Sequence, residues 1–142
     1  MTLTLEAAQT IVSKGLAHAR DKGFKPLGIL VFDSRGALRA AGVEDGSSWK
    51  RAEIATGKAL GALGMGVGSR AIHKMAQERP YFTASLSHVF GGTMVPVPGG
   101  VLITKNGEVI GAVGVSGDNS DNDEAAAMAG IAAAGFTADP GA

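Results

Sequence analysis

The hydrophobic and polar positions of this chain predict helices that alternate with strand hairpins. Thr4 is suited to cap a first helix that ends near Lys22, with Gly23 after it. The apolar face of this helix is formed by residues three or four positions apart, namely Leu5, Ala8, Val12, Gly15, Leu16 and Ala19. Residues 27–33 are a continuous apolar run typical of a buried strand, and residues 37–43 are the expected antiparallel partner.

A second helix is predicted to begin near Ser47. Its apolar face is expected to contain Trp49, Ala52, Ala55, Thr56, Ala59, Leu60 and Leu63. This assignment directs the basic residues Lys50, Arg51 and Lys58 towards solvent. Ser69 can cap a shorter helix that ends at Arg79, because Pro80 cannot continue it.

The second half of the chain has the clearest hairpin signal. Residues 101–105 and 108–116 flank Asn106-Gly107, and this dipeptide supplies the two positive φ angles of a type I′ turn. The acids and Ser120 of the DNSDNDE segment predict the start of a last helix from Asn122 to about Ala134. Residues 81–100 are rich in Gly and Pro, which predicts a folded loop around at most one short strand. Two hairpins without parallel crossovers favour an α+β fold with an antiparallel sheet.

Length, charge and composition restrict the class of protein. A chain of 142 residues is expected to form one domain, residues 1–142. Lys plus Arg and Asp plus Glu each number 13, so no basic stripe is available and nucleic acid is not an expected partner. We expect no membrane span, because no run of about 18 apolar residues occurs. The first residues do not resemble a secretion leader, and we therefore expect a cytoplasmic protein.

Small residues must provide most of the packing in this chain. It contains 22 Gly but only one Trp, one Tyr and five Phe. Gly and Ala allow close approach of helices, sheets and subunits, and a net charge of zero does not oppose association. A homo-oligomer is therefore expected. The absence of Cys excludes disulfides and thiolate chemistry.

Two polar residues lie at the edges of the predicted apolar helix faces. His18 could point into a cleft beside the first helix, or it could be an ordinary boundary residue. Glu53 could face a ligand, or it could pair with Lys50 or Arg79. The three histidines, His18, His73 and His88, lack the i, i+4 spacing of a shared metal site.

The segment 79–100 is the strongest candidate for a binding loop. It contains the polar side chains of Tyr81 and His88, together with backbone amides that are open to a ligand at Gly91, Gly92, Gly99 and Gly100. Long structured loops often carry binding, although the same loop could pack at a subunit interface. The sequence is compatible with both interpretations.

The chain resembles the GlcG/HbpS family, which includes the C-terminal domain of PduO-type corrinoid proteins. The resemblance covers nearly the whole chain and rests on TLTLEAA, LGILVFDSRGALRAAGVEDG, FGG at Phe90, PGGVLI at Pro98 and GEVIGAVGVSG followed by NDEAAA. It implies a profilin-like fold, with a five-stranded antiparallel sheet flanked by helices, assembled into dimers and up to octamers. Some relatives bind haem or a related tetrapyrrole through a His of the first helix, and His18 is the candidate for this iron ligand.

These observations leave three functional hypotheses. The first is a non-catalytic protein that binds haem or a related tetrapyrrole through His18. The second is a small enzyme acting on an organic acid, since the ERPYFTASLSHVFGGTMVPVPGG stretch resembles a subgroup associated with organic-acid and aromatic catabolism. In that enzyme Glu53 or His88 would be the general acid or base, Arg79 would hold a carboxylate, and amides near Gly99 and Gly100 would stabilise an oxyanion. The third is an oligomer with a purely structural role.

Overall fold

The computed structural model describes residues 2–142, and its elements follow the order predicted from the sequence, with two additions. The helices are α1 (Leu5–Asp21), α2 (Arg51–Met65), α3 (Ser69–Glu78), α4 (Pro80–Val89) and α5 (Ser120–Ala133). The strands are β1 (Gly28–Asp33), β2 (Leu38–Val43), β3 (Gly100–Lys105), β4 (Glu108–Ser116) and β5 (Thr137–Asp139). Helix α4 and strand β5 are the two elements that the hydrophobic pattern did not predict.

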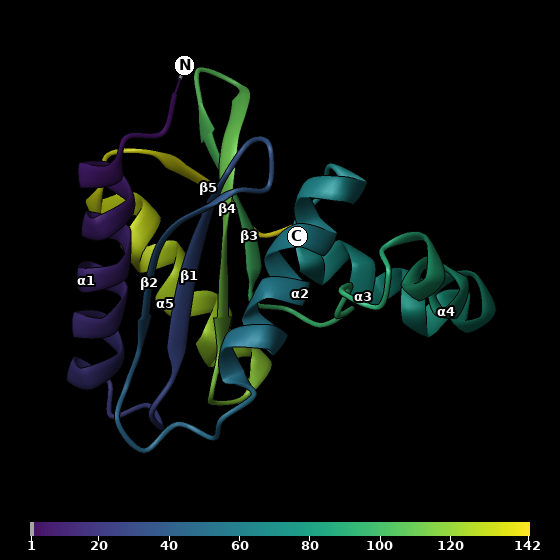
Figure 1. Ribbon diagram of the computed structural model, residues 1–142, viewed down its shortest axis with the longest axis horizontal. Coiled ribbons are helices and arrows are strands. Elements are labelled where there is room, and N and C mark those ends of the chain that lie inside the picture. The colour runs from purple at the N-terminus through teal and green to yellow at the C-terminus, as the bar shows by residue number, and fades with distance from the viewer. Residues whose placement is uncertain (1) are drawn as a thin grey trace.

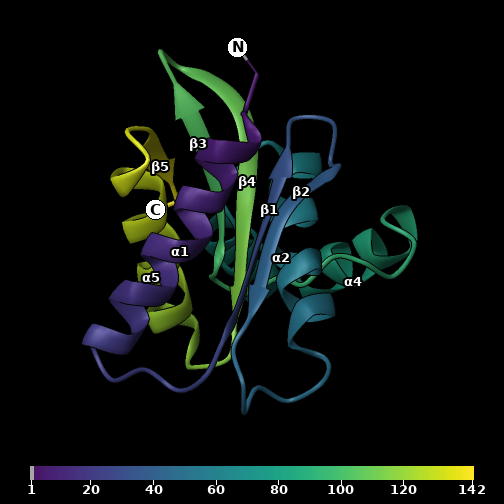
Figure 2. The same cartoon turned by 60° about the vertical axis from the view of Figure 1, so that its left-hand side comes forward.

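The strands form one five-stranded sheet in the order β2-β1-β4-β3-β5. Every neighbouring pair is antiparallel, which confirms the predicted α+β fold. Helices α1 and α5 lie side by side on one face of this sheet, and α2 lies on the other face (Figures 1 and 2). The sheet is therefore the central layer of three.

Strand β1 is buried along its whole length because both of its faces are covered. Ile29 and Val31 belong to the core under α1 and α5, whereas Leu30 and Phe32 belong to the core under α2. Successive side chains of a strand point to opposite faces, so a strand covered on both sides reads as a continuous apolar run. This explains the LGILVFD signal in the sequence.

Close contact between α2 and the sheet depends on glycine. A Cβ atom at Gly114 of β4 would collide with the main-chain carbonyl oxygen of Ala55 in α2. Ala55 and Ala59 are fully buried at the same contact. Small residues on both elements thus bring the helix backbone directly onto the strand.

Helices α3 and α4 extend away from the sheet as an arm (Figure 1). Ile72, Leu86 and Met94 form a small separate core in the arm, packed by Phe82 and Phe90 among others. The prediction of a loop over residues 81–100 is therefore wrong for its first half. Phe82, Leu86 and Phe90 have the four-residue spacing of a helix, and Pro80 occupies the first turn, where proline is tolerated.

The structure also confirms one predicted turn and corrects several predicted helix caps and buried positions. Asn106 and Gly107 have φ angles of 52° and 78°, which confirms the predicted turn. Ser69 is inside α3, whose N-cap is Gly68, and α5 is capped by the Asn119 side chain rather than by Ser120. Two residues assigned to buried helix faces are largely exposed, Trp49 at 83% and Leu5 at 50%.

Candidate functional site

His18 lies in the last turn of α1 and is half-buried. Its ring meets the ring of Phe24 edge-on, with 6.0 Å between centroids. Among the described residues, the imidazole nitrogens of His18 take part in no side-chain hydrogen bond. The imidazole is therefore held on a helix beside an aromatic ring, and its nitrogens are available to an external ligand.

An open hollow of about 440 Å³ lies at the same end of the molecule. It is lined by Arg20, Pro26, Val43, Glu44 and Asp45. The Arg20 guanidinium is held by the Glu44 carboxylate at 2.8 Å and donates to the Lys25 carbonyl at 3.0 Å. His18 does not belong to the lining of this hollow.

A second pocket, of about 480 Å³, lies between the outer side of α2 and the segment that follows α4. We call it the α2 pocket, and it is lined by Lys50, Glu53, Ile54, Thr56, Gly92, Thr93 and Val95. The Val95 amide donates to the Gly57 carbonyl at 3.1 Å, and a Cβ at Gly57 would collide with Thr93. Glycine at position 57 therefore lets the segment rest on α2. Two predicted site residues, Glu53 and Gly92, meet in this pocket.

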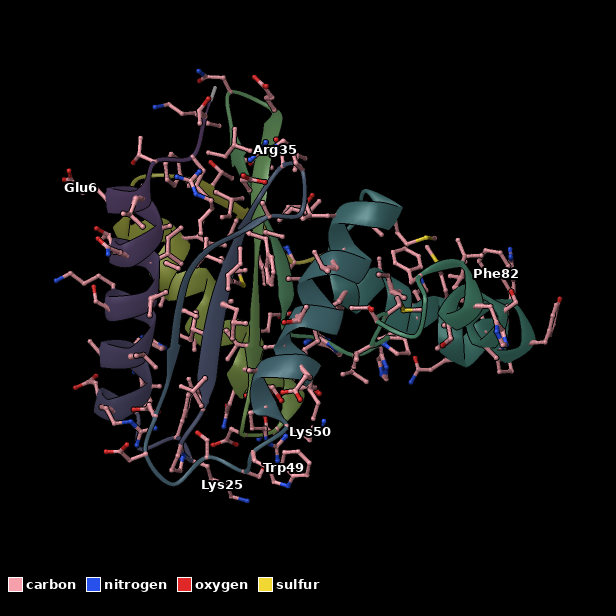
Figure 3. All side chains as sticks on the ribbon, in the orientation of Figure 1. Glu6, Lys25, Arg35, Trp49, Lys50 and Phe82 are labelled. Atoms are coloured by element: carbon pink, nitrogen blue, oxygen red, sulfur yellow. The ribbon has the colours of Figure 1, made fainter. Side chains whose placement is uncertain are left out.

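The charged groups of the α2 pocket are Lys50 and Glu53. They form an ion pair at 2.9 Å, with side chains 55% and 57% exposed. The hydrogen bond from Lys50 lowers the pKa of Glu53, so this carboxylate stays ionised at neutral pH. The Lys50 ammonium also lies 4.5 Å from the centre of the Trp49 ring, and the two residues are neighbours at the start of α2 (Figure 3).

The other candidate residues of the segment 79–100 are divided between two regions. Arg79 lies at the α3–α4 junction, with its guanidinium carbon 4.1 Å from the centre of the Phe82 ring. Phe82 itself lies out on the arm (Figure 3). Tyr81 and His88 are exposed on α4, and neither they nor Arg79 line the α2 pocket. Gly91 is exposed in the turn after α4.

Gly99 and Gly100, by contrast, are buried at the start of β3. The Gly100 amide donates to the Ser69 hydroxyl at 2.7 Å, and the Gly99 carbonyl accepts from the Val115 amide at 2.9 Å. Internal partners thus already satisfy these two groups. A Cβ at Gly99 would lie 2.8 Å from the Lys58 ammonium, so glycine leaves the space that this ammonium fills.

Lys58 and Asp123 form a buried ion pair that the sequence analysis missed. Lys58 was expected to face solvent, but its side chain is 3% exposed, and that of Asp123 is 2% exposed. The Lys58 ammonium donates to Asp123 Oδ2 at 3.1 Å and to the Val115 carbonyl at 2.9 Å. Asp123 Oδ1 accepts from the Asp118 amide at 2.9 Å. The pair links α2 and α5, which lie on opposite faces of the sheet.

Burial dominates the electrostatics of this pair. It raises the pKa of Asp123 and lowers the pKa of Lys58, while the attraction between the two charges opposes both shifts. The sequence did contain a signal for the position of Lys58. It is three residues after Ala55 and four before Ala62, both buried, so helical spacing places it on the sheet-facing side.

Within residues 2–142, His, Asp and Glu side chains form no group of three or more that could hold a metal ion. No helix in this range combines the length and the apolar character needed to cross a bilayer.

The three-layer fold defines a class of small α+β domains, and comparisons with known proteins identify the family. The family model described as "Haem degrading protein HbpS-like" matches residues 3–132. The chain belongs to this HbpS-like family, as the sequence motifs indicated. No curated protein sequence matches the chain significantly.

Solved structures of related proteins share the fold. The chain is 28% identical to HbpS, with a TM-score of 0.81 over 93% of this chain and 89% of HbpS. It is 25% identical to the Klebsiella pneumoniae protein ORFY, with a TM-score of 0.85 over 94% and 91% of the two chains. A PduOC:haem complex is 20% identical, with a TM-score of 0.86 over 96% and 97%, and shows likeness of fold alone.

Proposed function

We propose that this protein binds haem or a related tetrapyrrole and that His18 is the axial ligand of the iron. The observation that carries the proposal is the half-buried imidazole on α1, which lies edge-on to Phe24 and makes no side-chain hydrogen bond in the described part of the chain. Neutral imidazole is a common haem-iron ligand, so the chemistry of this donor fits the group. Membership of a haem-degrading family and structural likeness to a protein solved with haem support the same proposal.

The parts played by protein and cofactor are distinct. Bound iron would supply redox and oxygen chemistry. The chain would bind and orient the group, because a helix fixes the direction of the His18 side chain and Phe24 restricts its rotation. His88 is exposed on the arm and serves as a control.

The proposed site is completed by a second copy of the chain. His18 lies at the surface and does not line the neighbouring hollow, whereas a large ligand normally has most of its surface buried. The edge strand β2 carries two exposed apolar side chains, Leu38 at 56% and Val43 at 49%. Unpaired edge strands with apolar side chains are prone to self-association. A homo-oligomer would cover this edge and could bury more of the surface of a large ligand held by His18.

The test is an absorbance titration of haem-free protein with ferric haem, with the molecular mass followed by light scattering. We expect a saturable Soret shift with one haem or less per chain in the wild type and in His88→Ala. His18→Ala should lose the shift but keep the native fold by circular dichroism. Retention of the wild-type shift in His18→Ala would contradict the proposed ligand, and a strictly monomeric haem-bound protein would contradict the shared site.

A further inference from the structure

The α2 pocket is a second concave site, separate from His18 because α2 and α1 cover opposite faces of the sheet (Figure 2). Its walls are provided by Ile54, Val95 and the two threonines Thr56 and Thr93, all half-buried. The Thr56 hydroxyl already donates to the Ala52 carbonyl at 2.8 Å, so it can offer a ligand its methyl group and an oxygen that accepts, but no hydrogen-bond donor. The pocket is thus mainly apolar inside and charged where Lys50 and Glu53 lie.

The charges of the pocket constrain what it can hold. Lys50 and Glu53 are 2.9 Å apart and neutralise each other, so the pocket has no net charge from side chains. A simple carboxylate ligand could form an ion pair with Lys50, but its negative charge would then lie close to that of the ionised Glu53. A simple amine would meet the same conflict with Lys50. A ligand with an ammonium group and a carboxylate attached to the same carbon could pair with both Glu53 and Lys50, so neither side chain would face a like charge.

We propose that the α2 pocket binds a small zwitterion, an α-amino acid with an apolar side chain. The ligand carboxylate pairs with Lys50, its ammonium group pairs with Glu53, and its side chain lies against Ile54 and Val95. The Trp49 ring, 4.5 Å from the Lys50 ammonium, helps to keep this ammonium at the pocket when its pairing with Glu53 loosens. This site does not depend on haem. It assigns Glu53 a binding role in place of the predicted catalytic one, and Gly92 lies in the lining of the pocket.

Four small probes separate the parts of this proposal in calorimetric titrations of haem-free protein. L-leucine has both charges and an apolar side chain, whereas glycine has the charges alone. 4-Methylpentanoate lacks the ammonium group, and 3-methylbutylamine lacks the carboxylate. We expect saturable binding of L-leucine and at least about tenfold weaker binding of each of the other three, a factor that corresponds to the loss of one charge pair or of the apolar contact. Equal binding of 4-methylpentanoate and L-leucine, or no saturable binding of L-leucine, would overturn the proposal.

Variants and amide chemical shifts locate the binding. Lys50→Met and Glu53→Gln change exposed side chains and should each weaken L-leucine binding about tenfold. Lys74→Met and Glu78→Gln make the same changes at exposed positions of α3 and should keep the wild-type affinity. In a nitrogen–proton correlation spectrum, L-leucine should shift the amides of Ile54, Gly92 and Thr93. Binding that leaves these amides unmoved, or that is indifferent to Lys50 and Glu53, would refute the assignment even if haem binding is confirmed.

Discussion

The buried Lys58–Asp123 pair makes the sharpest prediction about the stability of this fold. Replacing Lys58 by Met removes the ammonium but keeps most of the side-chain volume. The substitution leaves the Asp123 carboxylate without its ionic partner at 2% exposure, and the Val115 carbonyl loses the hydrogen bond that Lys58 donates. Removing one member of a buried ion pair costs about 3–5 kcal/mol, because the remaining charge is uncompensated.

This loss is large compared with the stability of a whole domain, which is about 5–15 kcal/mol. It should lower Tm by on the order of 10 °C in a chain of this size. The double variant Lys58→Met with Asp123→Leu removes both charges. The free energy of unfolding of this double variant should therefore fall by much less than the sum of the losses in the two single variants. Apolar replacements of a buried ion pair are often close to neutral.

The two single variants should respond to pH in opposite directions. In Lys58→Met, the folded-state pKa of Asp123 is raised above its unfolded value, so the contribution of Asp123 to stability is fully present at acidic pH and is lost as the pH rises through that pKa. In Asp123→Asn, burial lowers the folded-state pKa of Lys58, so stability is present at alkaline pH and is lost as the pH falls through that value.

Urea denaturation between pH 4 and pH 9 measures both effects. Lys50→Met is the matched control, because it makes the same chemical change at a side chain that is 55% exposed, and it should leave stability nearly unchanged. The buried pair would not contribute as described if Lys58→Met lowered the free energy of unfolding no more than Lys50→Met. One shared pH trend in the two single variants of the pair would contradict it equally.

Two further predictions concern backbone contacts. Gly114→Val should destabilise the protein by about 3 kcal/mol or more in urea denaturation, because the new Cβ would collide with the Ala55 carbonyl. If the variant were as stable as the wild type, α2 would not rest on β4. Asp118→Ala should cost about 1–2 kcal/mol at pH 7, because the carboxylate accepts from the amides of Lys25 and Asn119, each at 2.7 Å. The hydrogen bond from the Lys25 amide holds the pKa of Asp118 below its usual value. The difference in free energy of unfolding between Asp118→Ala and wild type should therefore become smaller as the pH falls below about 4. A difference that became larger there would contradict this role of Asp118.

The sequence predicted most of the framework because its signals are local. The type I′ turn at Asn106-Gly107 depends on two backbone angles, and the run ending at Asp33 depends on burial of both faces of β1. Helix α4 was missed because Gly91, Gly92 and the prolines dominate the composition of its segment. Strand β5 was missed because three residues carry no periodicity.

The site residues were predicted less completely, because their surroundings are set by tertiary contacts. His18 was proposed as a site residue from its place at the edge of a helix face, and Glu53 from the same reasoning, which also named Lys50 as a possible partner of Glu53. The ion pair of Lys58 joins residues 65 positions apart, and no local pattern links them. Similarly, the α2 pocket depends on where the segment after α4 meets Gly57, and this contact is not visible in either segment alone.

The most direct test of the central claim is chemical rescue of the proposed iron ligand. His18→Gly removes the imidazole and leaves a space that free imidazole can occupy. If His18 ligates the iron, this variant should show no native Soret band with ferric haem, and added imidazole should restore the wild-type band saturably. If the variant gives the wild-type spectrum without imidazole, the iron is held elsewhere and the account of His18 is wrong.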